Sequence, residues 1–360
     1  MSLSLPQASG RIDVHHHLLP PALLEALDRH GISDMAGGPV PKWSPQQSLD
    51  IMDLHGVGTA ITSVSAPGVR FADEGAARSL ARACNEFAAE MTVRHPGRFG
   101  AFAILPMPFT ASACAEAIHA LDVLKADGVV LLGSVDGVFL GDPRFEELMA
   151  ELDRRSAVVF IHPNLHPSSE ALGLDMPGFL MEFLCDTTRA SLNLILMGVI
   201  ERYPRIRWIL AHAGGFLPYA AWRLSLANLM PTFAERAPQG VLTYMRRFYF
   251  DTALSPSPFA MAALGQLVDH SHILFGSDFP FAPAPVTALQ VEGIDTLPLW
   301  NSSQGEAVCR ANALALFPRL AGRDETPSAP AAYRTQTLSQ RLRGAALRPV
   351  LRVVDRIRNR

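Results

Sequence analysis

The sequence predicts an α/β protein built as a (β/α)8 TIM barrel with a basic C-terminal extension. Short apolar runs rich in β-branched residues recur eight times along the chain, and amphipathic stretches of helical period lie between them. Eight parallel strands, each followed by a helix, can close into a barrel. The alternative, an open doubly wound sheet, normally has a glycine-rich loop after its first strand, where this chain reads HHHLLPP.

The expected elements follow from these runs and from the Pro, Gly, Asp and Ser residues that bound them. Strands are expected at Ile12–His17, Thr59–Ser65, Phe99–Leu105, Gly128–Gly133, Ala157–His162, Arg207–His212, Phe248–Ala253 and Ile273–Asp278. Helices are expected at Glu74–Arg94, Ser112–Ala126, Phe145–Arg155, Pro177–Arg202, Phe216–Leu226, Pro258–Asp269 and Gly305–Phe317. The long loop Ile32–Ser48 is a candidate cover for an active site.

The composition is that of a globular protein with a sizeable core, since 49% of the 360 residues are hydrophobic and 18% are charged. A net charge of −3 gives no indication of nucleic-acid binding. The four cysteines have no CxxC spacing, which favours reduced thiols and a cytoplasmic location. No apolar segment is long enough to cross a membrane, so we expect no transmembrane segment.

Charge divides the chain into a body and a tail. Residues 323–360 contain nine arginines against three acidic residues, a charge of +6, whereas the rest of the chain is acidic. We therefore expect an N-terminal extension over residues 1–10, a barrel over residues 11–322, and a linker with a basic helical tail over residues 323–360.

Two histidines at the end of the first strand are candidate metal ligands. Residues two apart on a strand share a face, so His15 and His17 point the same way and His16 points oppositely. Two imidazoles on one face can bind one ion, although an isolated pair of this kind is equally compatible with a polar strand edge.

Three other strands end in residues that also bind metals. The fifth strand ends in His162, the sixth in His212 and the eighth in Asp278. The parallel strands of a barrel bring their C-terminal ends to one rim, where barrel enzymes place their active sites. Together with His15 and His17, these residues form a set of five potential ligands that is improbable as a coincidence.

The ligand types indicate which metal the site would bind. Imidazoles with a carboxylate favour Zn²⁺ first and other divalent first-row ions, such as Mn²⁺, second. In many barrel hydrolases a modified lysine at the end of the fourth strand bridges two ions, and here that strand reads GVVLLGS. We therefore expect one ion.

Six motifs carry a resemblance to a known family. In order, IDVHHH, FIHP, ERYPRIRWILAHAGG, FYFDTA, LFGSDFPF and RANALALF resemble the amidohydrolase superfamily, over roughly residues 11–320. Within it the chain is most similar to the decarboxylase branch, which includes aminocarboxymuconate semialdehyde, 6-methylsalicylate and γ-resorcylate decarboxylases. Resorcylate-type enzymes commonly have Glu as the first residue of the HxH pair, and PGVRF and LGDPRF resemble the methylsalicylate type.

The resemblance implies a role for each residue of the set. His15, His17, His162 and Asp278 match the ligands of a single divalent ion. His212 matches a histidine that acts beside the metal, which reduces the ligands from five to four. Asp278 could also shuttle a proton.

Three residues are candidate substrate contacts. Arg70 lies just beyond the second strand and could anchor a carboxylate through its forked guanidinium. His166 follows the fifth strand in a proline-rich loop, and each of these two is equally compatible with an ordinary surface role. By resemblance, Arg223 reaches the substrate of a neighbouring subunit, which implies a homodimer or higher homo-oligomer. The Trp that follows the fifth-strand His in the aminocarboxymuconate enzyme is replaced here by Asn164.

The expected function is metal-dependent, non-oxidative decarboxylation of an aromatic or unsaturated carboxylic acid, a hydroxybenzoate or a muconate semialdehyde. The metal would orient the small-molecule carboxylate, and a positioned acid would protonate carbon before CO₂ loss. The alternative is a hydrolase of a lactone, amide or amidine, because the same ligands would activate a water. The ligand chemistry permits both reactions, and the preference for the first comes from the resemblance.

Overall fold

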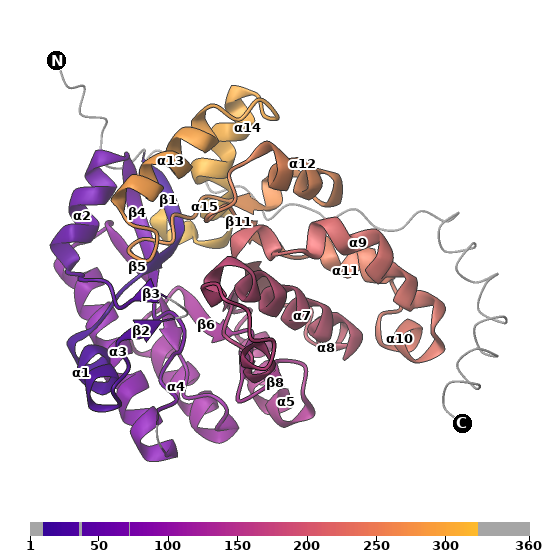
Figure 1. Cartoon of the computed structure of the whole chain (residues 1–360), viewed down its shortest axis with the longest axis horizontal. Coiled ribbons are helices and arrows are strands. Elements are labelled where there is room, and N and C mark those ends of the chain that lie inside the picture. The colour runs from indigo at the N-terminus through magenta and orange to yellow at the C-terminus, as the bar shows by residue number, and fades with distance from the viewer. Residues whose placement is uncertain (1–9, 36–37, 72, 323–360) are drawn as a thin grey trace.

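Eight parallel strands form the centre of the molecule, as the computed structural model shows for residues 10–35, 38–71 and 73–322 (Figure 1). Sheet neighbours follow one another in chain order, which is the topology of a (β/α)8 barrel. The strands are β1 (Arg11–His17), β4 (Val57–Ser63), β5 (Phe99–Ile104), β6 (Gly128–Leu132), β9 (Val158–His162), β10 (Arg207–Leu210), β11 (Tyr249–Asp251) and β12 (Ile273–Leu274).

The barrel is closed by contacts between its first and last strands. His16 forms a parallel bridge with Phe279, just beyond β12. The amide of Val14 donates to the carbonyl oxygen of Phe275 at 2.9 Å, and that of His17 donates to the carbonyl oxygen of Phe279 at 2.7 Å. The predicted barrel is therefore confirmed. Two short hairpins lie outside it, β2 (Asp34–Met35) with β3 (Gly38–Pro39) and β7 (Ser134–Val135) with β8 (Val138–Phe139).

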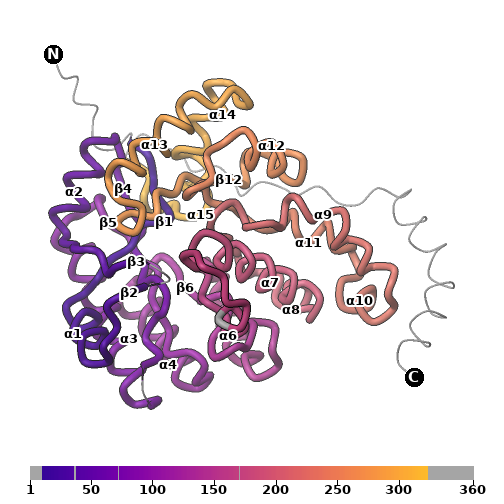
Figure 2. The backbone as a smooth tube through the Cα atoms, in the orientation of Figure 1, coloured from indigo at the N-terminus to yellow at the C-terminus, as the bar shows by residue number. Residues whose placement is uncertain are grey.

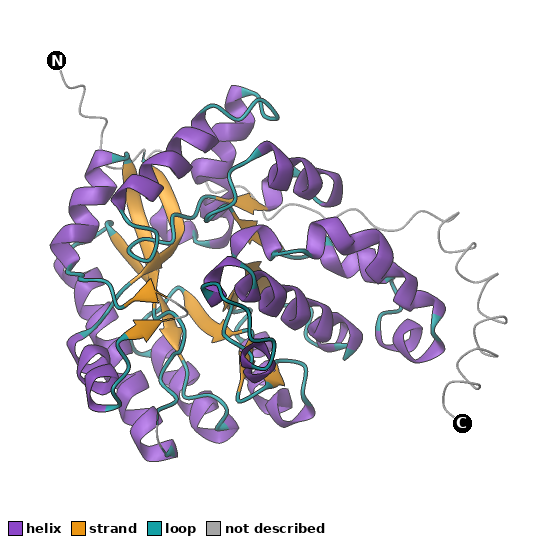
Figure 3. Ribbon diagram, in the orientation of Figure 1, coloured by secondary structure: helices purple, strands orange, loops and turns teal. Residues whose placement is uncertain are grey.

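Helices surround the sheet on its outer side (Figure 3). Several begin where the sequence supplies a cap, since Ser44, Asp73 and Ser257 accept hydrogen bonds from the first turns of α2, α3 and α12. The helices are α1 (Pro21–Arg29), α2 (Pro45–Leu54), α3 (Glu74–Arg94), α4 (Thr110–Asp122), α5 (Glu146–Arg154), α6 (Pro167–Glu170), α7 (Glu182–Leu196), α8 (Val199–Arg202), α9 (Leu217–Ser225), α10 (Pro231–Arg236), α11 (Val241–Met245), α12 (Pro258–Leu267), α13 (Ala284–Asp295), α14 (Ser302–Glu306) and α15 (Asn312–Leu316).

Alternate side chains of β9 pack into different parts of the core. Val158 and Phe160 contact one apolar cluster, and Val159 and Ile161 contact another, because successive side chains of a strand point to opposite faces. Phe160 lies in the barrel interior, where its ring is 4.9 Å from that of His15. His162 continues the alternation of Val158 and Phe160, so it emerges on the interior face at the rim.

Two predicted elements differ from the structure. The helix expected at Pro177–Arg202 is divided into a 3₁₀ turn, α7 and α8. The break between α7 and α8 lies at Gly198, which takes a left-handed φ of 74°. The strand expected to end at Asp278 stops at Leu274, and Asp278 has a φ of 60°. Figure 2 traces the backbone from β12 to α13, the segment that contains this turn.

Two further expectations concern the chain as a whole. No helix within the described ranges is long and apolar enough to cross a membrane. The linker and basic tail expected over residues 323–360 lie outside the described residues, as does most of the N-terminal extension.

Candidate metal centre

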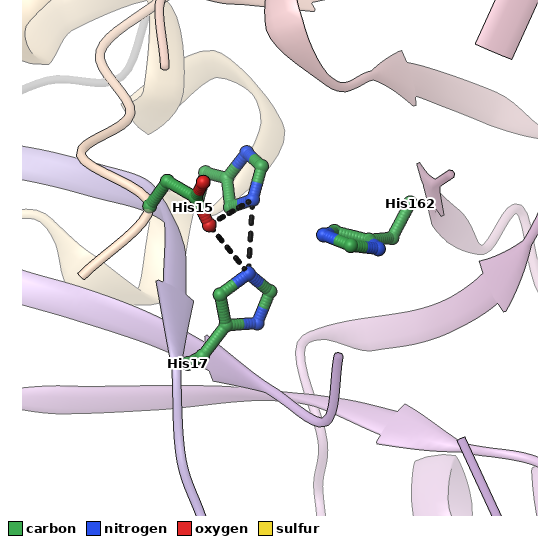
Figure 4. A group of neighbouring side chains, drawn as sticks. His15, His17 and His162 are labelled. Carbon is green, nitrogen blue, oxygen red and sulfur yellow. Dashed lines mark hydrogen bonds and ion pairs between the residues drawn. The ribbon is translucent and has the colours of Figure 1, made fainter. Parts of the chain in front are cut away.

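Three histidines and one aspartate meet at the C-terminal rim of the barrel. His15 and His17 come from β1, His162 from the end of β9, and Asp278 from the turn after β12. One donor atom of each residue lies within 4.8 Å of the others, and all four side chains are buried. Figure 4 shows the rings of His15 and His17 turned toward each other, with His162 approaching from the opposite strand.

Hydrogen bonds on the far side of each ring decide which nitrogen faces the cluster. The Nδ1 atom of His15 lies 2.7 Å from a carboxylate oxygen of Asp251. The Nδ1 atoms of His17 and His162 lie 3.1 Å and 2.8 Å from the carbonyl oxygens of Ser63 and Pro163. Because oxygens of these kinds accept hydrogen bonds, each Nδ1 carries the hydrogen. In its neutral form, each of the three rings therefore directs an Nε2 lone pair into the cluster.

The distances between donor atoms fit a single ion. His15 Nε2 and His17 Nε2 are 3.0 Å apart, and Asp278 Oδ1 lies 3.2 Å from the first and 3.0 Å from the second. Tetrahedral coordination with bonds of about 2.0–2.1 Å places neighbouring ligand atoms about 3.3 Å apart. Lone pairs and a carboxylate oxygen repel one another at such distances unless a proton or a metal ion lies between them, and the spacing of the donor set fits a divalent metal.

The electrostatics of the cluster also favour a cation. Burial opposes the charged form of His15, but the carboxylates of Asp251 and Asp278 raise the pKa of its ring to about 10. Burial lowers the pKa of His17 and, with the adjacent rings, holds the pKa of His162 well below its usual value. Burial disfavours ionised Asp278, yet the neighbouring His15 holds its pKa well below the ordinary value. The cluster thus combines an ionised carboxylate with rings that resist multiple protonation.

His212 stands beside these donors with its ring free for other contacts. Both ring nitrogens are buried without a hydrogen-bond partner, and Nε2 lies 3.6 Å from Asp278 Oδ2. The residue has a left-handed φ of 54° and is followed by Ala213 at 55°, an unfavourable backbone conformation that concentrates at functional sites. The side chain is therefore held at the cavity wall, next to the carboxylate oxygen that faces away from His15 and His17.

Asp251 connects His212 to the metal donors. One carboxylate oxygen is the partner of His15 Nδ1, and the other accepts the amide hydrogens of His212 at 2.8 Å and Ala253 at 3.0 Å. Asp251 ends β11 at this rim, so one buried carboxylate fixes both the ring of His15 and the backbone that carries His212. The absence of a side chain at Gly276 permits the approach, since a Cβ there would lie 2.8 Å from that of His15.

A second buried carboxylate supports the opposite side of the cluster. Asp13 accepts from the amides of His15 and Ser277 and from the ring of His16, which is turned away from the cluster as expected. His16 Nε2 lies 2.9 Å from Ser48 Oγ, which also accepts from Trp43 Nε1. This network was not predicted, because it joins residues that are distant in the sequence and individually unremarkable.

A cavity of about 830 Å³ leads from the metal donors to the surface. His162, His212 and Asp278 line its inner end together with Ser65. Met35, Gly38, Pro39 and Pro41, all from the loop predicted to cover the site, line part of its outer wall. Two aromatic rings of the described lining lie near the donors: Phe183 is 5.7 Å from His162 between ring centroids, and Phe281 is 5.2 Å from His17.

The three predicted substrate contacts lie elsewhere in the protomer. Arg70 pairs with Asp136 at 3.4 Å and lies over the ring of Phe109. His166 caps α6 and stacks on Phe139. Arg223 is exposed on α9. None of the three belongs to the described lining of the cavity.

Comparison with known proteins places the chain in a family. Residues 12–319 match the amidohydrolase family. The chain belongs to the amidohydrolase family. A 6-methylsalicylic acid decarboxylase from Penicillium expansum is 38% identical over 318 residues, which cover 87% of this chain and 98% of that protein.

Solved structures agree with the fold of this amidohydrolase. A crystal structure described as an amidohydrolase II is 32% identical with a TM-score of 0.80, covering 86% of this chain and 99% of the other. A dihydroxybenzoic acid decarboxylase from a Polaromonas species, solved with manganese and 2-nitroresorcinol, has a TM-score of 0.75 at 23% identity, covering 86% and 97%. The family match and the 38% identity to the 6-methylsalicylic acid decarboxylase confirm the predicted resemblance to the decarboxylase branch.

Proposed function

We propose that this amidohydrolase is a metal-dependent, non-oxidative decarboxylase of an aromatic carboxylic acid. The observation that carries the proposal is the convergence of three imidazole lone pairs and one carboxylate oxygen at the inner end of an apolar cavity. The similarity to 6-methylsalicylic acid decarboxylases supports decarboxylation over hydrolysis, which the same donors would permit. A muconate semialdehyde remains the second candidate for the substrate class.

His15, His17, His162 and Asp278 would hold one divalent ion. The donor set, with three nitrogens and one oxygen, favours Zn²⁺, and Mn²⁺ is the alternative. When bound, the ion supplies a positive charge that orients and polarises the carboxylate of the substrate. Elemental analysis of purified protein should find about one equivalent of metal per chain, and two equivalents would contradict the single-ion proposal.

His212 and Asp278 are the proposed catalytic residues. In decarboxylation of a hydroxybenzoate, the ring carbon that bears the carboxylate accepts a proton from His212. The bond to the carboxyl carbon then breaks, its electron pair restores the aromatic ring, and CO₂ leaves. His212 regains a proton from solvent, and Asp278 Oδ2, 3.6 Å from His212 Nε2, is placed to orient that ring or to pass the proton.

Arg70, His166 and Arg223 are the proposed substrate contacts, although none of them lines the described cavity. Arg70 and His166 would have to leave their present partners, Asp136 and Phe139, to reach a ligand. Alanine substitution of each, with KM as the readout, tests these roles. An unchanged KM would remove that residue from the binding site.

Arg223 would act across a homodimer. On the same helix Tyr219 is 87% exposed and Trp222 is 74% exposed, and Phe259 on the adjoining α12 is 90% exposed. Large aromatic side chains that are exposed together favour a protein interface. The mass in solution should correspond to a dimer or larger, and Trp222→Asp should shift it toward a monomer. A wild-type monomer would contradict the proposal.

We also propose a cytoplasmic location, which cell fractionation would test.

One assay separates the two reactions. Metal-loaded protein is incubated with hydroxybenzoates and muconate semialdehydes, and CO₂ release is measured beside hydrolysis of ester, lactone and amide substrates. Release of CO₂ with formation of the matching phenol supports decarboxylation. Turnover of a lactone or amide without CO₂ from any acid would establish the hydrolase instead.

A further inference from the structure

We propose that the substrate is a hydroxybenzoate with one carboxylate and an alkyl substituent longer than methyl, held by the apolar part of the cavity. This inference rests on the proposed decarboxylase function and names its substrate class.

Charge is confined to the inner end of the cavity. His162, His212 and Asp278 are at most 6% exposed, and they are the ionisable side chains in the described lining, which contains no Lys, Arg or Glu. A carboxylate at the metal donors would therefore meet the bound ion, whereas a second carboxylate farther out would lose its hydration and find no cationic side chain in the described lining. Such desolvation is costly, so the cavity selects against dicarboxylates.

Aromatic rings flank the metal donors. Phe183 lies beside His162 and Phe281 beside His17, at ring-centroid distances of 5.7 Å and 5.2 Å. An aromatic acid with its carboxylate at the donors would place its ring between or against these two side chains, in offset or edge contacts. The other substituents of the ring would then point toward the mouth.

The outer wall offers few hydrogen-bond partners. Beyond the inner end, Ser255 is the one polar side chain in the described lining. Five of the lining residues are prolines, which have no backbone N–H to donate: Pro39, Pro41, Pro177, Pro280 and Pro283. Additional hydroxyl groups on the substrate would be buried there without compensation, whereas an alkyl chain would gain from burial.

The cavity is larger than a one-ring acid requires. Cavities of about 300–1,000 Å³ hold drug-sized ligands, and this cavity has about 830 Å³. Leu180, Leu254 and Phe179 extend its apolar lining to the surface, where they are 55%, 46% and 40% exposed. A chain of several carbon atoms could therefore run from the ring to this mouth and cover apolar surface along the way.

A homologous series of substrates tests the inference. Salicylates with methyl, propyl or pentyl at position 6 or at position 4 are supplied to the metal-loaded enzyme, and kcat/KM is measured. We expect kcat/KM to rise with chain length in at least one series, by up to about fourfold for each methylene group that becomes fully buried. A flat or falling dependence in both series would overturn the proposal.

Binding of the products distinguishes failure of the inference from failure of the proposed function. Both series yield 3-alkylphenols, whose Kd is measured by calorimetry. If no acid releases CO₂ but the Kd still falls from 3-methylphenol to 3-pentylphenol, the reaction is wrong and the apolar site stands. If methylsalicylate is decarboxylated while longer acids and phenols bind no more tightly, the function stands and the inference fails.

A matched pair of variants tests whether the alkyl chain of the substrate binds at the mouth of the cavity. Leu180 and Leu172 are 55% and 56% exposed, but only Leu180 lines the cavity. Leu180→Asn should lower the ratio of pentyl to methyl kcat/KM by about threefold or more, and Leu172→Asn should leave that ratio unchanged. Equal effects of the two substitutions would contradict binding of the alkyl chain at the mouth.

A second carboxylate on the substrate tests the charge argument. The kcat/KM for 4-hydroxyisophthalate should be at least about tenfold lower than that for 5-methylsalicylate, and equal values would overturn the argument.

Discussion

At its inner end the cavity is lined by His162, His212 and Asp278, whose exposed fractions are at most 6%, whereas Phe179 and Leu180 at its mouth are 40% and 55% exposed. The inner residues lie at or next to strand ends, where buried carboxylates and carbonyl oxygens fix their orientation. Phe179 and Leu180 lie in the 3₁₀ turn that precedes α7, away from any strand end. This difference predicts that residues at the strand ends carry the chemistry and that residues at the mouth select the substrate.

The largest effect on activity is expected from substitution of His17, a candidate metal ligand, compared with the adjacent His16. His17→Gln should lose the metal and all measurable CO₂ release, because one of four ligands is removed. His16→Gln, which alters the adjacent buried ring, should retain the metal and lose about 1–3 kcal/mol of stability through its bonds to Asp13 and Ser48. Elemental analysis, CO₂ release and urea unfolding compare the two, and equal metal contents would remove His17 from the ligand set.

His212→Asn separates catalysis from metal binding at the same end. The variant should keep its metal, since His212 is outside the proposed ligand set, while kcat falls by about 10²–10⁴-fold through loss of the proton donor. Rates at saturating substrate, with bound metal measured in the same samples, provide the test. Loss of the metal along with activity would instead make His212 a ligand.

Asp251→Asn should have a smaller effect, since Asp251 acts through other residues. The substitution weakens the partner of His15 Nδ1, so metal affinity should fall by about 10–100-fold. Competition with a chelator measures that affinity, and kcat at saturating metal reports whether His212 also moves. Asp136→Asn, at an exposed carboxylate that pairs with Arg70, is the control and should leave the metal Kd unchanged.

The smallest effect is expected in the loop near the mouth. Leu174 is 51% exposed, so Leu174→Asn should change the free energy of unfolding by no more than about 0.5 kcal/mol. Ile161→Ala, at a fully buried position next to His162, should cost about 2–5 kcal/mol. Urea unfolding of both variants compares the two regions, and a large loss at Leu174 would show that the loop is part of the packed core.

The sequence predicted that the four candidate donors meet, because each follows an apolar run typical of a strand. His15, His17 and His162 could be placed on one rim once eight strands were recognised, and Asp278 followed from the run LFGSD even though the strand stops early. The division of the helix expected at Pro177–Arg202 was missed, because a single Gly198 in a left-handed conformation has no distinct signal within an apolar amphipathic stretch.

The barrel, and the meeting of the four candidate donors and His212 at one rim, follow from strand periodicity and parallel topology, which are local properties with a fixed geometric consequence. Folding adds the contacts of Asp251 and Asp13 with these residues and joins Trp43 to them through Ser48. It also leaves Arg70, His166 and Arg223 outside the described lining of the cavity. These contacts join loops and strands that are far apart in the chain, and their geometry depends on how the loops pack rather than on any repeating pattern.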